Sequence, residues 1–339
     1  MAQVQISFDS AQHIGKREEQ QDACGVFTET DHARQAPFLF LLADGMGGLQ
    51  YGKEAAELAI ETIVSSFSSK KPETPIQEAL EGAARSANEK IYRMADKAGC
   101  AGEAGTTLIA CALQGSTLYW VSVGDSRIYL FRNNTLQQLN EEHNLRNRLA
   151  ALAAKGLFPI DDIETNPQKE ALTSFIGIET LKEIDGENRE LLLEPGDHVL
   201  LCSDGLFKTL NSKEIIGILN GAKQEKIASQ LVKSTINRDA PHQDNVSVVH
   251  LQYPGKRAHR SHSEITTEQR NKKKPSSAGL AANTSSKKEA QPEIRRKETG
   301  RDFFTRTIAD SKKKTFLWMF LAVAFGACLA SYRIFFTAR

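Results

Sequence analysis

A run of apolar residues, Phe38 to Ala43, stops abruptly at Asp44, and glycine occupies three of the next four positions. The pattern predicts a strand that delivers a carboxylate to a glycine-rich turn, followed by a helix. A strand end holds its carboxylate rigidly, and glycine lets the backbone approach a bound ion closely. The turn therefore suits a metal or phosphate site. The alternative is that Asp44 caps the helix that follows.

Three further acidic residues, Asp22, Asp204 and Asp244, also lie where a predicted strand meets a turn. If these strand ends converge, the carboxylates repel each other unless hard divalent cations such as Mg²⁺ or Mn²⁺ neutralise them. No His and Cys grouping has the spacing of a zinc site. Two ions would activate water toward a phosphorus atom. Arg17 would bind the phosphate, with a solvated surface arginine as the alternative.

Apolar residues alternate, or recur at helical spacing, along most of residues 1–253. Predicted strands span 3–8, 22–27, 38–43, 106–113, 117–123, 127–131, 190–193, 198–202 and 246–251, and predicted helices span 54–67, 76–95, 144–155, 212–219 and 224–236. Short turns between residues 106 and 131 predict an antiparallel meander. Because strands and helices come in runs, the expected fold class is α+β with mainly antiparallel sheet.

Charge divides the chain into an acidic part and a basic tail. Residues 254–339 hold 19 of the 43 Lys and Arg but only 7 of the 42 Asp and Glu, which leaves 24 against 35 in residues 1–253. This acidic part suits cations and argues against nucleic acid as a partner. The five cysteines are odd in number and form no CxxC pair, so we expect free thiols and a reducing compartment.

The tail is predicted to anchor the protein in a membrane. Residues 254–314 read as a basic disordered linker, and Thr315 to Tyr332 carries no charge. At 1.5 Å per residue that segment would be roughly 27 Å long, enough to span a bilayer as a single helix before a short tail at 333–339. A buried core helix is the alternative. The Lys312 to Lys314 cluster favours a cytoplasmic location for the preceding domain.

Nine motifs in order give the chain a family resemblance. They are REEQQD at 17–22, ADGMGG at 43–48, AGTTL at 104–108, VGDSRIY at 123–129, EEHNL at 141–145, LTSFIG at 172–177, EPGD at 194–197, LCSDGL at 201–206 and QDNVSVV at 243–249. This series resembles the metal-dependent serine/threonine protein phosphatases of the PPM type, also called type 2C, in their bacterial form. The resemblance covers residues 1 to about 252.

The resemblance implies a four-layer αββα sandwich with a binuclear Mg²⁺ or Mn²⁺ centre at one end of two antiparallel sheets. The residues that it assigns are Asp44 as the bridge between both ions, Gly45 through its carbonyl, Asp204 and Asp244 as ligands, Gln21 and Asp22 through water, and Arg17 on the phosphate. Asp125, together with Asp204, would hold a third ion. A tight-turn aspartate is the alternative for Asp125.

Several positions depart from the family pattern. Met46 stands where animal members carry a histidine proposed as general acid, so water or another group must protonate the leaving alkoxide. Glu142 stands where Asp is usual, and Ser174 where Arg is common; His143 is expected to order a loop. Residues 147–168 correspond to a flap near the active site, where substrate preference is expected to lie.

The predicted function is removal of phosphate from phosphoserine and phosphothreonine in proteins. The basic linker and the C-terminal helix would hold the domain at a membrane, near lipid and membrane-bound Ser/Thr kinases. The alternative is a catalytically silent phosphoprotein-binding module at the membrane.

Overall fold

A computed structural model describes residues 6–28, 37–46, 51–186, 189–221 and 226–254. The strands are β1 Ser7–His13, β2 Asp22–Thr28, β3 Phe38–Met46, β4 Gly105–Thr106, β5 Leu108–Gln114, β6 Thr117–Val123, β7 Arg127–Arg132, β8 Thr135–Gln138, β9 Glu190–Leu192, β10 His198–Cys202 and β11 Val246–Gln252. The helices are α1 Gly52–Ser68, α2 Ile76–Lys97, α3 Leu145–Ala154, α4 Asp161–Thr165, α5 Asp204–Phe207, α6 Ser212–Gly221 and α7 Ile227–Ile236.

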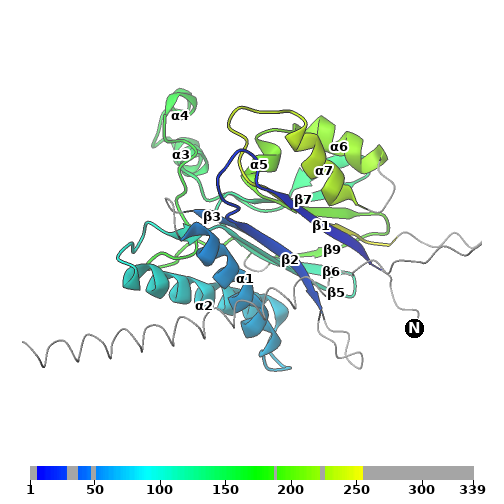
Figure 1. The fold of residues 1–339 in the computed structure, drawn as a ribbon, viewed down its shortest axis with the longest axis horizontal. Helices are drawn as coiled ribbons and strands as arrows, with labels where there is room; N and C mark the ends of the chain where they lie inside the picture. Colours follow the sequence, from blue (N-terminus) through cyan, green and yellow to red (C-terminus); the bar gives the residue numbers. More distant parts are fainter. Residues whose placement is uncertain (1–5, 29–36, 47–50, 187–188, 222–225, 255–339) are drawn as a thin grey trace, which may run out of the picture. The chain divides into compact units, whose positions relative to one another are not determined.

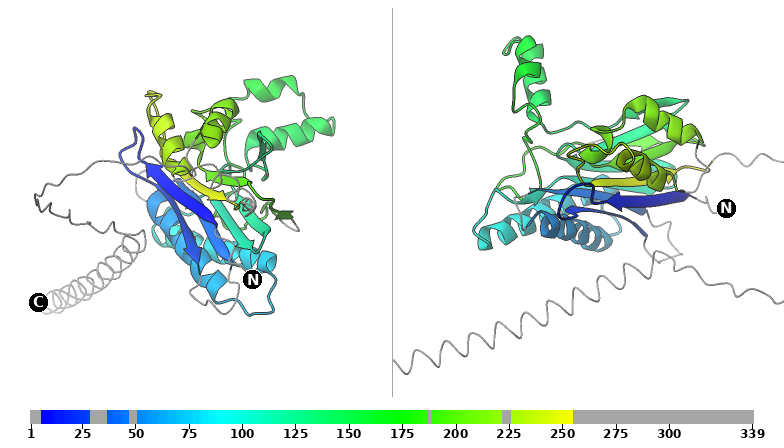
Figure 2. Two further views of the ribbon diagram at one scale, coloured as in Figure 1. Left: turned by 90° about the vertical axis from the view of Figure 1, so that its right-hand side faces the viewer. Right: turned by 45° about the horizontal axis from the view of Figure 1, so that its top comes forward.

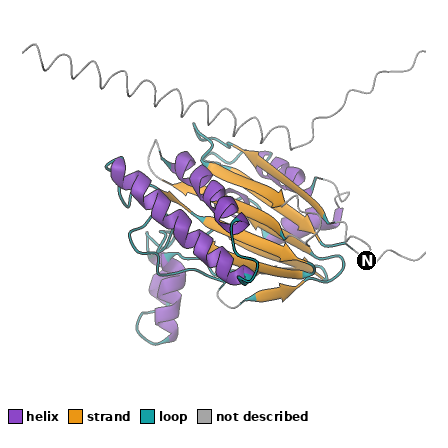
Figure 3. Cartoon of the chain, turned by 90° about the horizontal axis from the view of Figure 1, so that it is seen from below, coloured by secondary structure: helices purple, strands orange, loops and turns teal. Residues whose placement is uncertain are grey.

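Two antiparallel sheets form the centre of the fold that the described residues adopt. One sheet has the order β1-β11-β10-β7-β8, and the other has the order β2-β3-β5-β6-β9 with β4 beside β3. Helices α1 and α2 lie along the β2-β3-β5-β6-β9 sheet, while α5, α6 and α7 lie on the other sheet (Figure 1; Figure 3). The layers therefore follow the predicted order of helix, sheet, sheet and helix.

Three apolar cores separate the four layers. Strand β3 is continuously apolar in sequence because it contributes side chains to two of these cores. Leu39, Leu41 and Ala43 face the core beneath α1 and α2. Phe40 and Leu42 point the opposite way, into the core between the sheets. The third core lies between the β10-β11 side of the other sheet and helices α5, α6 and α7. Because both faces of β3 are buried, alternation disappears from its sequence.

The predicted meander is wrong at its third strand. Strands β5 and β6 pair as a hairpin, but β7 pairs with β10 and β8 in the other sheet. The segment Gly124 to Ser126 is therefore a crossover between sheets. Gly124 has a φ of +102°, and a Cβ there would lie 2.7 Å from Cγ2 of Thr107, so this close crossover requires glycine.

Other differences are local. Residues 3–5 of the first predicted strand lie outside the described ranges, and β1 continues beyond the predicted end at Phe8 to His13. Strand β8 and helices α4 and α5 lie where no regular element was predicted. Within the described ranges, no helix is long and apolar enough to cross a membrane. The predicted linker and the predicted membrane helix, Thr315 to Tyr332, lie outside those ranges.

A buried histidine pair connects β10, β11, β1 and α7. His250 Nδ1 lies 2.9 Å from Asp9 Oδ1, and His250 Nε2 lies 2.9 Å from His198 Nδ1. The other oxygen of Asp9 accepts a hydrogen bond from the backbone N–H of Ala228, at the start of α7. With Asp9 as acceptor, His250 donates from Nδ1, and a single proton occupies the contact between His250 Nε2 and His198 Nδ1.

This pair predicts acid sensitivity of the fold. Burial, with a smaller contribution from His250, lowers the pKa of His198 to about 4, whereas a histidine in an unfolded chain titrates near 6.5. Since the unfolded state takes up the proton first, this stabilisation is complete above about pH 6.5 and is lost as the pH falls toward 4. Between pH 7 and pH 5 we expect a loss of ~1–2 kcal/mol from this group.

Urea unfolding at both pH values checks the expectation with His198→Asn, which keeps a donor toward His250 but does not titrate in this range. The variant should lose less unfolding free energy between pH 7 and pH 5 than the unmodified protein. The same change at the exposed His242 should not alter the slope. Equal slopes for the protein and His198→Asn would contradict a lowered pKa at His198.

Candidate functional site

Four predicted aspartates gather at one end of the two sheets. Asp22 opens β2 and lies opposite Asp44 in the β2–β3 pairing. In the other sheet, Asp204 lies two residues after the end of β10, and Asp244 lies two residues before the start of the neighbouring strand β11. The hydroxyl of Ser203 donates a 2.9 Å hydrogen bond to Asp22 Oδ2, which connects the two groups across the sandwich. The structure thus brings together the strand ends that the sequence analysis singled out.

Burial and the charges of neighbouring carboxylates raise the pKa of several of these aspartates. Burial raises the pKa of Asp44 well above its usual range, and the charges of Asp22, Asp204, Asp125 and Asp244 add to that effect. Burial also raises the pKa of Asp22 to about 6, against hydrogen bonds from Ser247 and Ser203 that lower it. A cluster of carboxylates of this kind stabilises a cation that binds among them.

Asp44 belongs to β3 and does not cap α1. The helix begins at Gly52, and its preceding residue, Tyr51, makes no side-chain cap. The backbone of Asp44 is instead fixed by two threonines of the AGTTL motif. Its N–H donates to Thr107 Oγ1 at 3.0 Å, and its carbonyl accepts from Thr107 N and from Thr106 Oγ1, both at 2.9 Å. The side chain of Asp44 is therefore attached to a backbone that these hydrogen bonds hold in place.

Two glycines allow the loops of the site to approach closely. A Cβ at Gly45 would lie 2.2 Å from the carbonyl oxygen of Gly52 and 2.6 Å from that of Gln21. A Cβ at Gly205 would lie 2.0 Å from the carbonyl oxygen of Asn245. Any side chain at these positions would push apart the segments that carry Asp44, Asp204 and Asp244.

Two cations partly neutralise the cluster. Arg17 Nη2 lies 2.7 Å from Asp244 Oδ2, with the arginine side chain 61% exposed. Lys208 Nζ lies 2.5 Å from Asp204 Oδ2. Sequence analysis missed Lys208, because its place four residues after Asp204 becomes a signal only when the short helix α5 is known.

The remaining predicted residues line the same region. The backbone N–H of Gln21 donates to Asn245 Oδ1 at 2.7 Å, which ties the loop after Arg17 to the start of β11. The pKa of Asp125 is raised to about 6, first by burial and then by Asp204, so this residue belongs to the carboxylate cluster. Met46 ends β3 opposite Gly105 and brings no titratable group.

His143 does order a loop, as predicted. Its Nδ1 accepts a 3.2 Å hydrogen bond from the N–H of Gly124, while its own N–H donates to the Gly124 carbonyl at 2.8 Å. Burial lowers the pKa of the ring. These two contacts give His143 a structural role at the turn that carries Asp125.

The donor set fits hard cations completed by backbone oxygen or water. Five carboxylates face two cations, and the buried Oδ1 of Asp22 has no hydrogen-bond partner. Among the described residues, no three His, Cys, Asp or Glu side chains form a group that would hold an ion by themselves. Additional oxygen ligands, such as the Gly45 carbonyl and water, would be required.

Two cysteines adjoin this acidic region without taking part in it. Burial raises the pKa of Cys24, on β2, to about 12. Cys202, two residues before Asp204, has its pKa raised to about 12 by the same cause. Both side chains pack as small apolar groups in the cores.

The chain is similar to known phosphatases. A family model described as protein phosphatase 2C matches residues 10–233. The serine/threonine phosphatase stp of Listeria welshimeri is 30% identical over 210 residues, which cover 61% of this chain and 80% of that protein.

Two solved structures extend the similarity to the fold. The serine/threonine phosphatase PstP/Ppp of Mycobacterium tuberculosis has a TM-score of 0.60 and 26% identity, over 74% of this chain and 99% of that one. A PstP catalytic domain in complex with two manganese ions has a TM-score of 0.58 and 25% identity, over 73% of this chain and 97% of that one.

The threonine support of Asp44 is testable through stability. Thr107→Val removes the oxygen that accepts from Asp44 N and contacts Ser126 Oγ at 2.8 Å, and leaves the buried N–H unpaired. We expect a loss of ~1–3 kcal/mol in unfolding free energy, measured by urea denaturation. Thr135→Val, the same change at an exposed strand position, should have little effect. Equal losses would contradict the assigned role of Thr107.

Proposed function

The chain belongs to the protein phosphatase 2C family and is a serine/threonine protein phosphatase, and on that premise we propose how its carboxylate site carries out phosphate hydrolysis. Its substrates are phosphorylated serine and threonine residues of proteins. The family is metal-dependent, so the carboxylate cluster at the end of the sheets is the place where the ions would bind. The silent binding module considered above finds no support in the retained ligand set.

The proposed ions are two Mg²⁺ or Mn²⁺, consistent with the two manganese ions in the PstP catalytic domain. Asp44 would bridge them, and the Gly45 carbonyl, Asp204 and Asp244 would complete the protein ligands. Gln21 and Asp22 would act through water, and Asp125 with Asp204 would hold a third ion. Bound ions supply Lewis-acid activation of a water nucleophile and neutralise charge on the phosphoryl group.

The chain's own residues orient the substrate around this site. Arg17 is exposed and pairs with Asp244 through one nitrogen, so its guanidinium remains accessible to a phosphate oxygen. Its planar fork suits bidentate phosphate binding. Because Met46 has no proton to give, we assign protonation of the leaving alkoxide to solvent water. The observation that carries the proposal is the meeting of strand ends from both sheets, where Asp22 lies opposite Asp44 and accepts a hydrogen bond from Ser203, the residue before Asp204. Burial first and neighbouring carboxylates second raise the pKa of Asp22, Asp44 and Asp125 there.

Removing one carboxylate tests the site. Asp44→Asn in the full-length protein should lower kcat/KM on a phosphothreonine peptide with Mn²⁺ by about a hundredfold or more, since it removes the proposed bridge. Excess EDTA should abolish the activity of the unmodified protein. Titration calorimetry should show weakened Mn²⁺ binding to the variant. Asp96→Asn, at an exposed position on α2, should change neither quantity, and Asp44→Asn with normal activity or Mn²⁺ binding would refute the assignment.

The cellular setting is a second proposal. Thr315 to Tyr332 would cross a membrane once, with the catalytic domain on the cytoplasmic side and the basic linker attracted to anionic lipid. This placement would raise the effective concentration of the enzyme near membrane-bound phosphoproteins, including Ser/Thr kinases of that membrane. The charge-free segment and the preceding lysines support the proposal.

Cell fractionation distinguishes a membrane-spanning anchor from peripheral association with the membrane. The full-length protein should pellet with membranes and resist a high-salt wash, because burial of an 18-residue apolar helix does not depend on ionic strength. Deletion of residues 315–332 should move it to the supernatant. Deletion of residues 275–292, the same length taken from the linker, should leave it in the pellet. Release of the full-length protein by salt would contradict the anchor.

A further inference from the structure

Helices α3 and α4 form an arm that projects from the sandwich beside the site. The two helices pack against each other and stand out from the body of the domain (Figure 2). Leu157 and Ile160 lie between them and are 70% and 72% exposed, the highest values among the large apolar residues of the described chain. The contacts at the base of the arm set the direction in which this apolar tip points.

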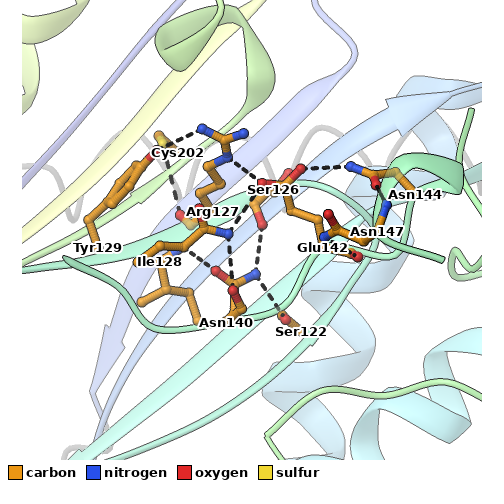
Figure 4. Close-up of polar contacts among 11 residues, drawn as sticks. Ser122, Ser126, Arg127, Ile128, Tyr129, Asn140, Glu142, Asn144, Asn147 and Cys202 are labelled. Carbon is orange, nitrogen blue, oxygen red and sulfur yellow. Dashed lines mark hydrogen bonds and ion pairs between the residues drawn. The ribbon is translucent and has the colours of Figure 1, made fainter. Parts of the chain in front are cut away.

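Three consecutive residues fix the base of the arm. Asn144 caps α3 by accepting a 2.9 Å hydrogen bond from Asn147 N. His143 is bonded to Gly124, in the turn that carries Asp125. Glu142 Oε2 accepts a 2.8 Å hydrogen bond from Asn144 Nδ2, and Glu142 Oε1 lies 2.6 Å from Arg127 Nε (Figure 4). The first turn of the arm is thus tied to the start of β7.

Arg127 continues the connection toward α5. Its guanidinium carbon lies 3.6 Å from the ring centroid of Phe207, in the helix that begins with Asp204. Its Nη1 donates to the hydroxyl of Tyr129 at 2.9 Å. The side chains of Arg127 and Glu142 are only 27% and 10% exposed. Partly desolvated charges bonded in several directions fix geometry more strongly than surface pairs do.

A second set of hydrogen bonds reaches Asp44 from the same place. Asn140 accepts from Ile128 N at 2.8 Å and donates to the Ser126 carbonyl at 2.9 Å (Figure 4). The hydroxyl of Ser126 contacts Thr107 Oγ1, which accepts from Asp44 N. The base of the arm and the backbone of Asp44 therefore share one polar framework.

We propose that Arg127 and Glu142 are positioning residues, which fix the direction in which the α3–α4 arm projects beside the carboxylate site, so that its tip contacts the polypeptide of a phosphoprotein substrate. The proposal rests on the phosphatase function. Neither residue is among the proposed phosphate-binding residues or ion ligands. Loss of their ion pair should therefore affect substrates that extend to the arm and spare a small phosphate ester that does not.

The main test compares two substrates in the full-length protein. Glu142→Gln removes the charge and one acceptor, leaving Arg127 without its partner. We expect kcat/KM on a phosphothreonine peptide to fall about tenfold, mainly through KM, and kcat/KM on p-nitrophenyl phosphate to stay within about twofold. Glu142→Asp keeps the carboxylate and should recover part of the loss. Glu141→Gln, the same change at the exposed neighbouring residue, should behave like the unmodified protein.

Hydrogen exchange supplies a readout that needs neither substrate nor metal. In the metal-free protein, amides of residues 145–165 should exchange faster in Glu142→Gln than in Glu141→Gln. Asn144→Asp, which keeps the helix cap but replaces the donor to Glu142 by a repelling carboxylate, should reproduce both effects if Glu142→Gln does not fold.

The outcomes separate the two levels of the proposal. If the unmodified protein is inactive on both substrates, the proposed function is refuted. The hydrogen-exchange result would still test whether the pair of Arg127 and Glu142 restrains the arm. Equal losses on both substrates, or unchanged exchange in the arm, would overturn the positioning role.

Discussion

The repulsion among carboxylates at the open end of the sandwich is the constraint that the rest of this structure serves. Asp22, Asp44, Asp125, Asp204 and Asp244 come from both sheets, and nothing in their chemistry favours their meeting. The fold holds them because three apolar cores fix the sheets and helices, while short polar contacts fix the loops. Thr106 and Thr107 hold the Asp44 backbone, and the hydroxyl of Ser203 joins Asp22 from across the sandwich. Packing energy thus maintains an arrangement that electrostatics alone opposes.

Much of this arrangement was predictable from the sequence, because strand ends are marked by abrupt changes in composition. The apolar run before Asp44, the turn after Cys202 and the turn before Val246 placed three carboxylates correctly. The α1 and α2 helices were predicted within two residues at each end, since their apolar residues recur at helical spacing over several turns.

What the sequence did not reveal is mostly non-local. The turn at Gly124 to Ser126 looks like a hairpin because its residues favour tight turns, yet partner choice between two sheets is decided by packing. Strand β8 and helices α4 and α5 are too short for periodicity to identify. The ion pair of Arg127 with Glu142 joins residues 15 apart, and local patterns do not report such contacts.

The cysteines give the site a further property. Cys24 and Cys202 lie within two residues of Asp22 and Asp204, but burial raises the pKa of each thiol to about 12, so the reactive thiolate is suppressed at neutral pH. Oxidants such as hydrogen peroxide attack thiolates and leave carboxylates unchanged. Neither sulfur therefore offers an oxidant a reactive thiolate at neutral pH, and oxidative inactivation of the site through these two residues is disfavoured.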